Sequence, residues 1–242
     1  MDKRVQNLLK NHKASSLREL SGILGISFDK IKNVSSGRTS FNSLYVERKQ
    51  RRTESKHSKE LAELIGIVLG DGNISKFSRC QRLVISCNSR HKKYIEHIRW
   101  LVEGIFNKKP SLIKRSKANC IDIYLYLQDI DKTLGMPSGN KIKNSVAIPE
   151  WIFREKGYLK KCLKGLFETD GHYGLNKKSY VEYIQFCNKC ESLNRSVFRA
   201  LRNLDYSPQV PGSSYVRLAK KVQVRRFIKE MVFQRPFPAL MN

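Results

Sequence analysis

A short sequence occurs twice in this chain, at widely separated positions. Residues 64–72 read LIGIVLGDG and residues 163–171 read LKGLFETDG, so both copies end in Asp-Gly. Farther on, Ile85-Ser-Cys87-Asn88 follows the first copy and Gln185-Phe-Cys187-Asn188 follows the second. A repeat at this separation indicates one structural unit built twice, which constrains the fold more than any other feature of the sequence.

Each copy begins with an amphipathic helix and continues as strands. The apolar residues before each Asp-Gly fall on one helical face. Alternating or β-branched runs, which are typical of strands, follow at Leu83–Cys87, Cys120–Leu127, Val181–Phe186 and Ser214–Leu218. We therefore predict an α+β fold with pseudo-two-fold symmetry, made of an αββαββα-like repeat at residues 58–150 and again at 151–242.

Small residues recur at helical spacing in both repeated segments: Gly66 and Gly70 in the first, Gly165 and Thr169 in the second. Small side chains at this spacing let two helix backbones approach closely, so we expect Gly66 and Gly165 at a helix interface. Helices paired on these faces bring their C-terminal residues, Asp71 and Asp170, side by side.

Two such carboxylates are unfavourable without a cation. A carboxylate at a helix C-terminus meets the negative end of the dipole, and two neighbouring carboxylates repel each other. Mg²⁺ removes both penalties and takes carboxylate oxygens together with waters and substrate phosphates. Two such ions activate a water and stabilise the leaving oxygen of a phosphodiester. The pair therefore predicts a metal-dependent nuclease centre, whereas one Asp-Gly alone would be an ordinary turn.

Composition favours a nucleic-acid partner. The 242 residues carry 47 Lys and Arg against 21 Asp and Glu, a net charge of +26. Such a charge points to a polyanion, and a hydrophobic content of 40% excludes a disordered tail protein. The sequence has neither an apolar run long enough for a membrane span nor a secretory signal, so we expect a soluble intracellular protein without a membrane partner.

Both repeated segments resemble the LAGLIDADG motif of homing endonucleases, and their duplication is similar to the monomeric, two-motif type. The resemblance covers about residues 58–242 and includes Met136-Pro-Ser-Gly-Asn-Lys-Ile-Lys143, which is similar to the stretch before the second motif. It implies two antiparallel, saddle-shaped sheets astride DNA and metal-dependent cleavage of both strands at a long asymmetric site. It also implies that Asp71 and Asp170 bind Mg²⁺, or Mn²⁺ as a substitute, with Gly70 and Thr169 completing the metal site.

The family places basic residues around its metal centre, where they offset developing charge. Three lysines are candidates for this role: Lys220 and Lys221 after the last predicted strand, and Lys141 in the first half. Arg, Lys, Asn and Gln on antiparallel strands read base edges in the major groove. The candidates for DNA contact are Lys76, Arg79, Gln81, Arg82, Asn176, Lys177, Lys178, Gln185 and Arg217.

The first 46 residues predict a separate helical unit. Ser16 and Glu19 have capping-box spacing, Gly25 ends a helix, and apolar residues continue in a further helix. This pattern is similar to a DNA-binding helix-turn-helix, whose last helix would present Lys30, Lys32 and Asn33. A plain three-helix unit that touches no DNA is the alternative. Residues 47–57 are basic and without periodicity, as in a linker.

Cys187 and Cys190 have the half-site spacing of structural zinc, but no second pair accompanies them. The simpler interpretation is that Cys187 ends a strand and Cys190 opens a helix.

For the whole chain, the leading function is a site-specific endonuclease acting on double-stranded DNA as a monomer. The alternatives are a non-cleaving maturase with an intron RNA partner, or a transcription regulator. The expected location is the cytoplasm or nucleoid, or an organelle in a eukaryote.

Overall fold

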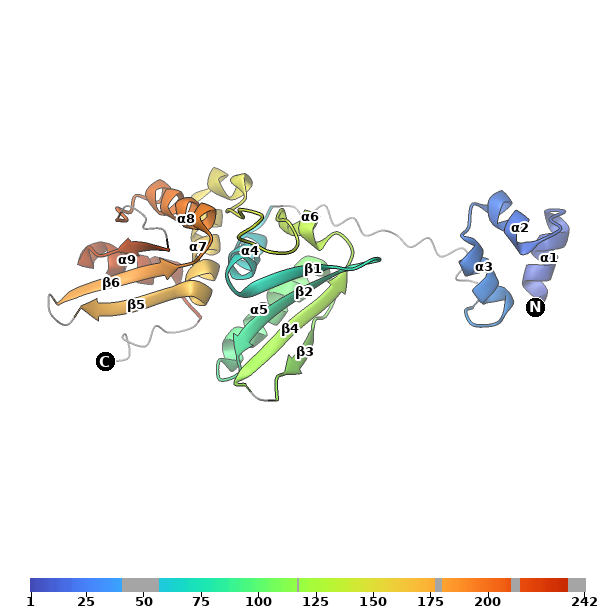
Figure 1. Cartoon of the computed structure of the whole chain (residues 1–242), viewed down its shortest axis with the longest axis horizontal. Coiled ribbons are helices and arrows are strands. Elements are labelled where there is room, and N and C mark those ends of the chain that lie inside the picture. Colours follow the sequence, from blue (N-terminus) through green and yellow to red (C-terminus); the bar gives the residue numbers. More distant parts are fainter. Residues whose placement is uncertain (41–56, 117, 177–179, 210–213, 235–242) are drawn as a thin grey trace. The chain divides into compact units, whose positions relative to one another are not determined.

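The computed structural model describes residues 1–40, 57–116, 118–176, 180–209 and 214–234. The chain divides into two compact units, Met1–Arg52 and Thr53–Asn242 (Figure 1). Most of the predicted linker at 47–57 lies outside the described residues. Within the described part, no helix combines the length and the apolar character needed to cross a bilayer.

Residues 1–40 of the first unit form three short helices, α1 (Lys3–Asn11), α2 (Leu17–Leu24) and α3 (Phe28–Ser35). The Ser16 hydroxyl accepts a hydrogen bond from the Glu19 backbone N–H and so caps α2, as the sequence predicts. Gly25 ends α2 with φ of 62°, a left-handed conformation that favours glycine. Apolar side chains from all three helices form a small core of their own: Val5, Leu20, Ile31 and Val34.

The second unit alternates helices and strands. In chain order it contains α4 (Lys59–Asp71), β1 (Gly72–Lys76), β2 (Gln81–Asn88), α5 (Lys92–Phe106), β3 (Ser111–Lys114), β4 (Cys120–Leu127), α6 (Ile130–Leu134), the 3-10 helix η2 (Glu150–Arg154), α7 (Lys156–Asp170), β5 (Gly171–Asn176), β6 (Val181–Cys187), α8 (Glu191–Asn203), β7 (Tyr215–Leu218) and α9 (Lys221–Met231). The predicted α+β class is confirmed.

Two antiparallel sheets follow the two motif helices (Figure 1). The first has the order β1-β2-β4-β3, and the second has the order β5-β6-β7 within the described residues. On the edge of β7 that corresponds to the β3 side of β4, the Gln209 N–H donates to the Arg217 carbonyl at 2.8 Å. One face of each sheet packs into a common hydrophobic core, to which both α4 and α7 contribute.

The helices α4 and α7 pack against each other at two glycines. A Cβ atom on Gly66 would lie closer than 3.0 Å to the Cys162 carbonyl of α7. A Cβ on Gly165 would lie equally close to the Glu63 carbonyl of α4. The two backbones are therefore in direct contact, and the helices run side by side through the centre of the unit.

The strand register corrects the sequence alignment of the two halves. Gly72 pairs with Ile85 in the first sheet, and Gly171 pairs with Phe186 in the second. Cys187 is thus equivalent to Ser86, so the alignment of Cys87 with Cys187 is wrong by one residue. Because side chains alternate along a strand, such a slip exchanges the two faces of the sheet. Cys87 is accordingly buried, whereas Cys187 is exposed.

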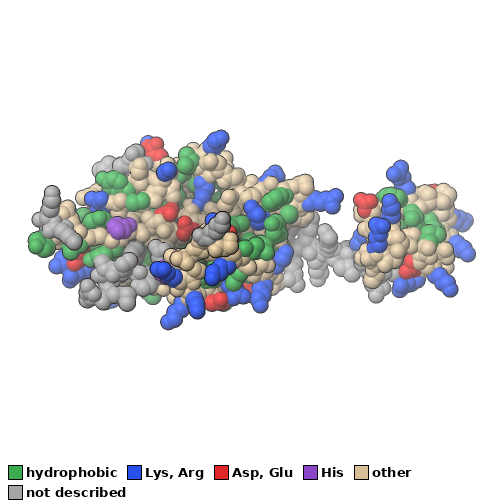
Figure 2. Space-filling view, turned by 60° about the horizontal axis from the view of Figure 1, so that its bottom comes forward, with side chains coloured by type: hydrophobic (Ala, Val, Ile, Leu, Met, Phe, Trp, Pro, Cys, Tyr) green, Lys and Arg blue, Asp and Glu red, His purple; other side chains and the backbone are tan. Residues whose placement is uncertain are grey.

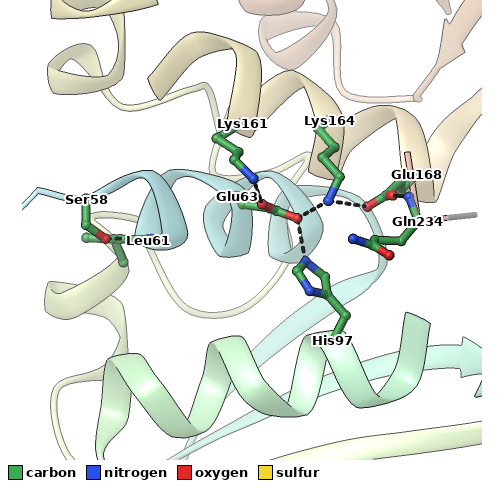
Figure 3. A network of polar contacts seen from close by, with 8 residues as sticks. All are labelled: Ser58, Leu61, Glu63, His97, Lys161, Lys164, Glu168 and Gln234. Carbon is green, nitrogen blue, oxygen red and sulfur yellow. Dashed lines mark hydrogen bonds and ion pairs between the residues drawn. The ribbon is translucent and has the colours of Figure 1, made fainter. Parts of the chain in front are cut away.

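A buried group of charges connects α4, α5 and α7 (Figure 3). Glu63 of α4 is 1% exposed and accepts hydrogen bonds from Lys164 and Lys161 of α7. His97 of α5 lies 2.6 Å from the same carboxylate. Burial raises the pKa of Glu63, but the hydrogen bonds from these three side chains and the Lys164 charge outweigh it and bring the pKa to about 2.

Glu168 belongs to the same buried group. It stands one helical turn after Lys164, whose ammonium lies 3.8 Å from the Glu168 carboxylate, and it accepts a hydrogen bond from the Gln234 backbone N–H. Burial raises the pKa of Glu168, while the Lys164 charge acts in the opposite direction. This acidic residue of the second motif therefore serves the helix interface.

Candidate active site

Asp71 and Asp170 are the last residues of α4 and α7. Gly72 and Gly171 follow them in extended backbone, with φ of −86° and −83°. Glycine is required here because a side chain has no room, and not because the backbone is left-handed. A Cβ on Gly72 would lie 2.5 Å from the Val68 Cα. Each helix thus leads directly into the first strand of its own sheet.

The helix ends that carry the two carboxylates adjoin each other. A Cβ on Gly70 would lie closer than 3.0 Å to the Thr169 side chain, so the residues immediately before Asp71 and Asp170 are in contact. The Thr169 hydroxyl donates to the Leu166 carbonyl at 2.8 Å, within its own helix. The structure therefore brings the four residues of the predicted metal site to one place.

Lys141 also reaches this place, from the segment between the two halves. Its ammonium donates to the carbonyls of Val68 at 3.1 Å, Leu69 at 2.8 Å and Gly70. The Val68 carbonyl also accepts the Gly72 backbone N–H, whereas Leu69 and Gly70 belong to the last turn of α4, where carbonyls lack helical partners and a cation is favourable. Burial lowers the pKa of Lys141, and the charges of Asp170 and Asp71 oppose this effect.

Asn188 holds the second carboxylate, a contact that the sequence analysis missed. Its side-chain amide donates to Asp170 at 2.7 Å, and its side-chain oxygen accepts from the Cys190 N–H at 2.9 Å. Burial raises the pKa of Asp170, while the Asn188 hydrogen bond and the Lys141 charge act in the opposite direction. Asn188 stands one residue after β6, so its role depends on the strand register that the sequence alignment misplaced.

The donor atoms at this place fit a hard divalent cation. Carboxylate oxygens and a helix-terminal carbonyl are the ligand types that Mg²⁺ and Mn²⁺ accept, with waters and phosphates completing the shell. A half-buried carboxylate with a raised pKa, as Asp170 is, would be stabilised in its charged form by a nearby cation. Among the described residues no cluster of three His, Cys, Asp or Glu side chains is present, so an all-protein cage of that kind is not formed there.

Two of the predicted lysines lie elsewhere. In β7, Tyr215 pairs with Cys187 and Leu218 pairs with Ile184, so the strand runs away from the Asp170 end of the sheet. Lys220 and Lys221 follow Leu218 at the start of α9. With about 3.4 Å per strand residue, they lie more than about 10 Å farther along the sheet. This register does not bring the two lysines to the ends of α4 and α7, and their role at the metal centre stays a prediction.

The DNA-contact candidates fall into different environments. Arg82, Gln185 and Arg217 lie on the face of each sheet that points away from the core, as their strand partners show. Lys76, Arg79 and Asn176 are exposed, and Lys177 and Lys178 lie outside the described residues. Gln81 is 7% exposed and accepts from the Asp131 N–H at 3.0 Å, so it cannot read DNA. Lys30, Lys32 and Asn33 lie on α3 of the first unit.

The cysteine pair follows the simpler interpretation. Cys187 is the last residue of β6, and Cys190 stands immediately before α8. Cys190 is 2% exposed, and its thiol lies 3.1 Å from the Ser192 hydroxyl.

A scan of protein-family models finds no match for this chain. The Replication factor C small subunit of Methanocaldococcus jannaschii is 24% identical over 182 residues, which are 69% of this chain but only 9% of that protein. A mesophilic variant of the homing endonuclease I-DmoI superimposes with a TM-score of 0.50 at 17% identity, over 72% of this chain and 95% of that one.

I-DmoI in complex with DNA and Ca gives a TM-score of 0.50 at 18% identity, over 75% of this chain and 94% of that one. Full-length DUF199/WhiA from Thermatoga maritima gives 0.51 at 15% identity, over 74% of this chain and 58% of that one. These likenesses show that the chain has a LAGLIDADG-type fold, which confirms the resemblance seen in the sequence.

Proposed function

We propose that this protein is a divalent-metal-dependent endonuclease that cuts both strands of double-stranded DNA at a specific, long and asymmetric site. The observation that carries the proposal is the meeting of Asp71 and Asp170 at the adjoining ends of α4 and α7. A protein that only binds DNA gains nothing from two carboxylates beside phosphates, which they repel.

In this proposal Asp71 and Asp170 hold Mg²⁺ or Mn²⁺, with Gly70 and Thr169 beside them. When bound, the metal supplies a water nucleophile at neutral pH and stabilises the leaving oxygen of the phosphodiester. Asn188 keeps the Asp170 carboxylate oriented through its 2.7 Å hydrogen bond. Lys141 places a positive charge at the end of α4 and near both carboxylates. There it offsets negative charge that develops on the phosphate during cleavage.

DNA binding in this proposal uses both units. Lys and Arg side chains are spread over both units in the view of Figure 2, and a net charge of +26 provides many phosphate contacts. The faces of the two sheets that point away from the core would contact base edges. The helix α3, with Lys30, Lys32 and Asn33, would enter a major groove as the recognition helix of a helix-turn-helix. Both halves lie in one chain, so the active form is a monomer.

The helical first unit also favours a second function, a transcription regulator that binds DNA without cutting it. The two functions predict opposite results with intact DNA. A regulator leaves a bound target uncut in Mg²⁺ and in Mn²⁺, whereas an endonuclease cuts both strands.

The test begins with a target selected by the full chain from random double-stranded DNA. We expect cleavage of that target in Mg²⁺, and loss of cleavage in Asp71→Asn and in Asp170→Asn. DNA affinity should stay within about tenfold, or about 1.4 kcal/mol, because the carboxylates serve the chemistry. Asp129→Asn is the matched control, since Asp129 is an exposed carboxylate paired with Lys132. Full cleavage by both active-site variants would contradict the proposal.

A further inference from the structure

The outward face of the second sheet carries an arginine held in one position. Arg217 of β7 lies beside Gln185 of β6 in the strand register. Its Nε and Nη2 both donate to the Gln185 side-chain oxygen, at 2.8 Å and 2.5 Å. The Gln185 amide in turn donates to the Cys187 sulfur at 2.8 Å. Arg217 is therefore oriented by a side chain that is itself tied down.

Two aromatic rings complete the support of Arg217. Its guanidinium carbon lies 4.5 Å from the ring centroid of Tyr183 and 5.1 Å from that of Tyr215. Stacking on tyrosine faces holds a planar guanidinium at little further cost in side-chain entropy. An arginine that is already ordered loses less freedom when it meets a ligand, which increases its affinity for a ligand that fits its fixed position.

The hydrogen bonds to Gln185 use only one edge of the guanidinium. They engage Nε and one N–H of Nη2, and among the described residues no hydrogen bond of Nη1 is seen. Of the three remaining N–H bonds, one on Nη1 and one on Nη2 form a parallel pair of donors. This pattern matches the O6 and N7 acceptors of guanine in the major groove, which arginine contacts in a bidentate manner.

The first sheet has nothing comparable at the equivalent place. Ile85 and Phe186 occupy matching positions, so Val84 and Tyr124 stand where Gln185 and Arg217 stand in the second sheet. Tyr126 and Ile113, on the same outward face, are 42% and 52% exposed. At the two equivalent positions, Val84 and Tyr124, the first sheet therefore has no bidentate donor.

We propose that Arg217, positioned by Gln185, reads a guanine in the half of the target bound by the second sheet. This inference rests on the proposed site-specific DNA binding and adds the identity of one base. Gln185 is then a positioning residue and not a direct reader of DNA. The target is expected to contain one G·C pair whose orientation is fixed by Arg217.

The test is a selection of binding sites from random double-stranded DNA in Ca²⁺ by the full chain and its variants. We expect the wild-type protein to select a site with guanine at one position of one half. Arg217→Lys keeps the charge but loses the planar fork, and it should lower the preference for that guanine about tenfold to a hundredfold while other positions keep theirs. Gln185→Ala should weaken the same preference by a smaller factor.

Arg225→Lys is the matched control, because Arg225 on α9 is exposed and lies 3.5 Å from the Glu182 carboxylate. It should leave the selected sequence unchanged. An unchanged guanine preference in Arg217→Lys would overturn the inference alone. A uniform loss of affinity for all sequences would also overturn it, since that result identifies a phosphate contact. A wild-type protein that selects no sequence would overturn the proposed function itself.

Discussion

In the first half of the second unit, α4 approaches its partner helix at Gly66, and in the second half α7 does so at Gly165. Each helix ends in a carboxylate, and the glycine that follows it has no room for a side chain. The two halves therefore place Asp71 and Asp170 by the same arrangement of a glycine contact and an Asp-Gly helix end. Backbone packing at the interface fixes where the helices end, independently of the polar side chains around them.

The polar surroundings of the halves differ. Lys141 covers the carbonyls at the end of α4, whereas Asn188 binds the carboxylate at the end of α7. The charged residues of the helix interface also differ between the halves. The position of Glu63 in α4 is occupied by Cys162 in α7, and the position of Lys164 in α7 is occupied by Ile65 in α4. The symmetric contacts set the geometry, while the asymmetric ones distinguish the halves, as the proposed asymmetric target requires.

The largest effect is expected where the halves are alike. Gly66→Ala and Gly165→Ala should each lower the free energy of unfolding by about 3 kcal/mol or more, because each new methyl would displace backbone across the interface. The measurement is chemical denaturation of each variant. Gly104→Ala in α5 is the control, since no atom lies within 4 Å of its added Cβ, and it should stabilise by about 0.5–1 kcal/mol.

Equal losses in the two variants would support the shared arrangement. If Gly66→Ala were tolerated and Gly165→Ala were not, the helices would be able to move apart at one glycine, and the symmetric description of the interface would fail.

The sequence predicts the symmetric features well because they depend on residue type and spacing. The repeated Asp-Gly pairs and the small residues four positions apart are visible in one dimension. Strand register is not, since a slip of one residue leaves the hydrophobic pattern almost intact and reverses the faces. Gln81, which the structure buries, and Asn188, which the sequence analysis missed, both depend on that register.

Long-range contacts are the other part that the sequence predicts poorly. The family resemblance named Lys141 together with Lys220 and Lys221, but nothing in the neighbours of Lys141 separates it from those two lysines or shows that it reaches α4 from a segment about 70 residues later. Lys220 and Lys221 share its residue type but follow the end of β7 that points away from Asp170. The Glu63 network depends on three helices meeting, which composition does not reveal.

Breaking the interface charges should produce the next largest effect. Glu63→Gln leaves Lys164 buried without its main partner, and we expect a loss of about 3 kcal/mol at pH 7. Glu96→Gln, at an exposed carboxylate of α5, is the control and should change stability by less than about 0.5 kcal/mol.

The pH dependence of stability tests the same carboxylate. A pKa lowered from 4.5 to about 2 in the folded protein contributes about 3 kcal/mol that is present above pH 4.5 and lost as the pH falls towards 2. Glu168 contributes with the opposite sign. Burial raises its pKa, so its protonation in acid stabilises the folded state relative to the unfolded state. Glu63→Gln should therefore flatten the acid limb of stability against pH. An unchanged acid limb would show that Glu63 is not the group responsible.

A smaller effect, on chemistry more than on folding, is expected at Lys141. Lys141→Met removes the charge beside both carboxylates, and we expect single-turnover cleavage of both strands to slow by about a hundredfold. The α4 carbonyls also lose a partner, at a cost of about 1 kcal/mol in stability. Lys143→Met is the matched control, because Lys143 is exposed two residues away. Cleavage at the wild-type rate would remove Lys141 from the centre.

The smallest effect is expected at Asn188, and it should show whether the two carboxylates act on different DNA strands. Asn188→Ala removes the 2.7 Å hydrogen bond to Asp170, and Asp71 keeps its own surroundings. If each carboxylate serves one scissile phosphate, the variant should cut one strand about tenfold more slowly, which is about 1.4 kcal/mol of barrier, and DNA cut in one strand should accumulate. Asn88→Ala is the matched control, because the Asn88 side chain makes the same turn contact, to the Arg90 N–H at 3.0 Å, in the other half. Strand-resolved gels measure both rates. Equal slowing of both strands would show that the two carboxylates act as one unit, so that the asymmetry between the halves would concern binding and not the order of cutting.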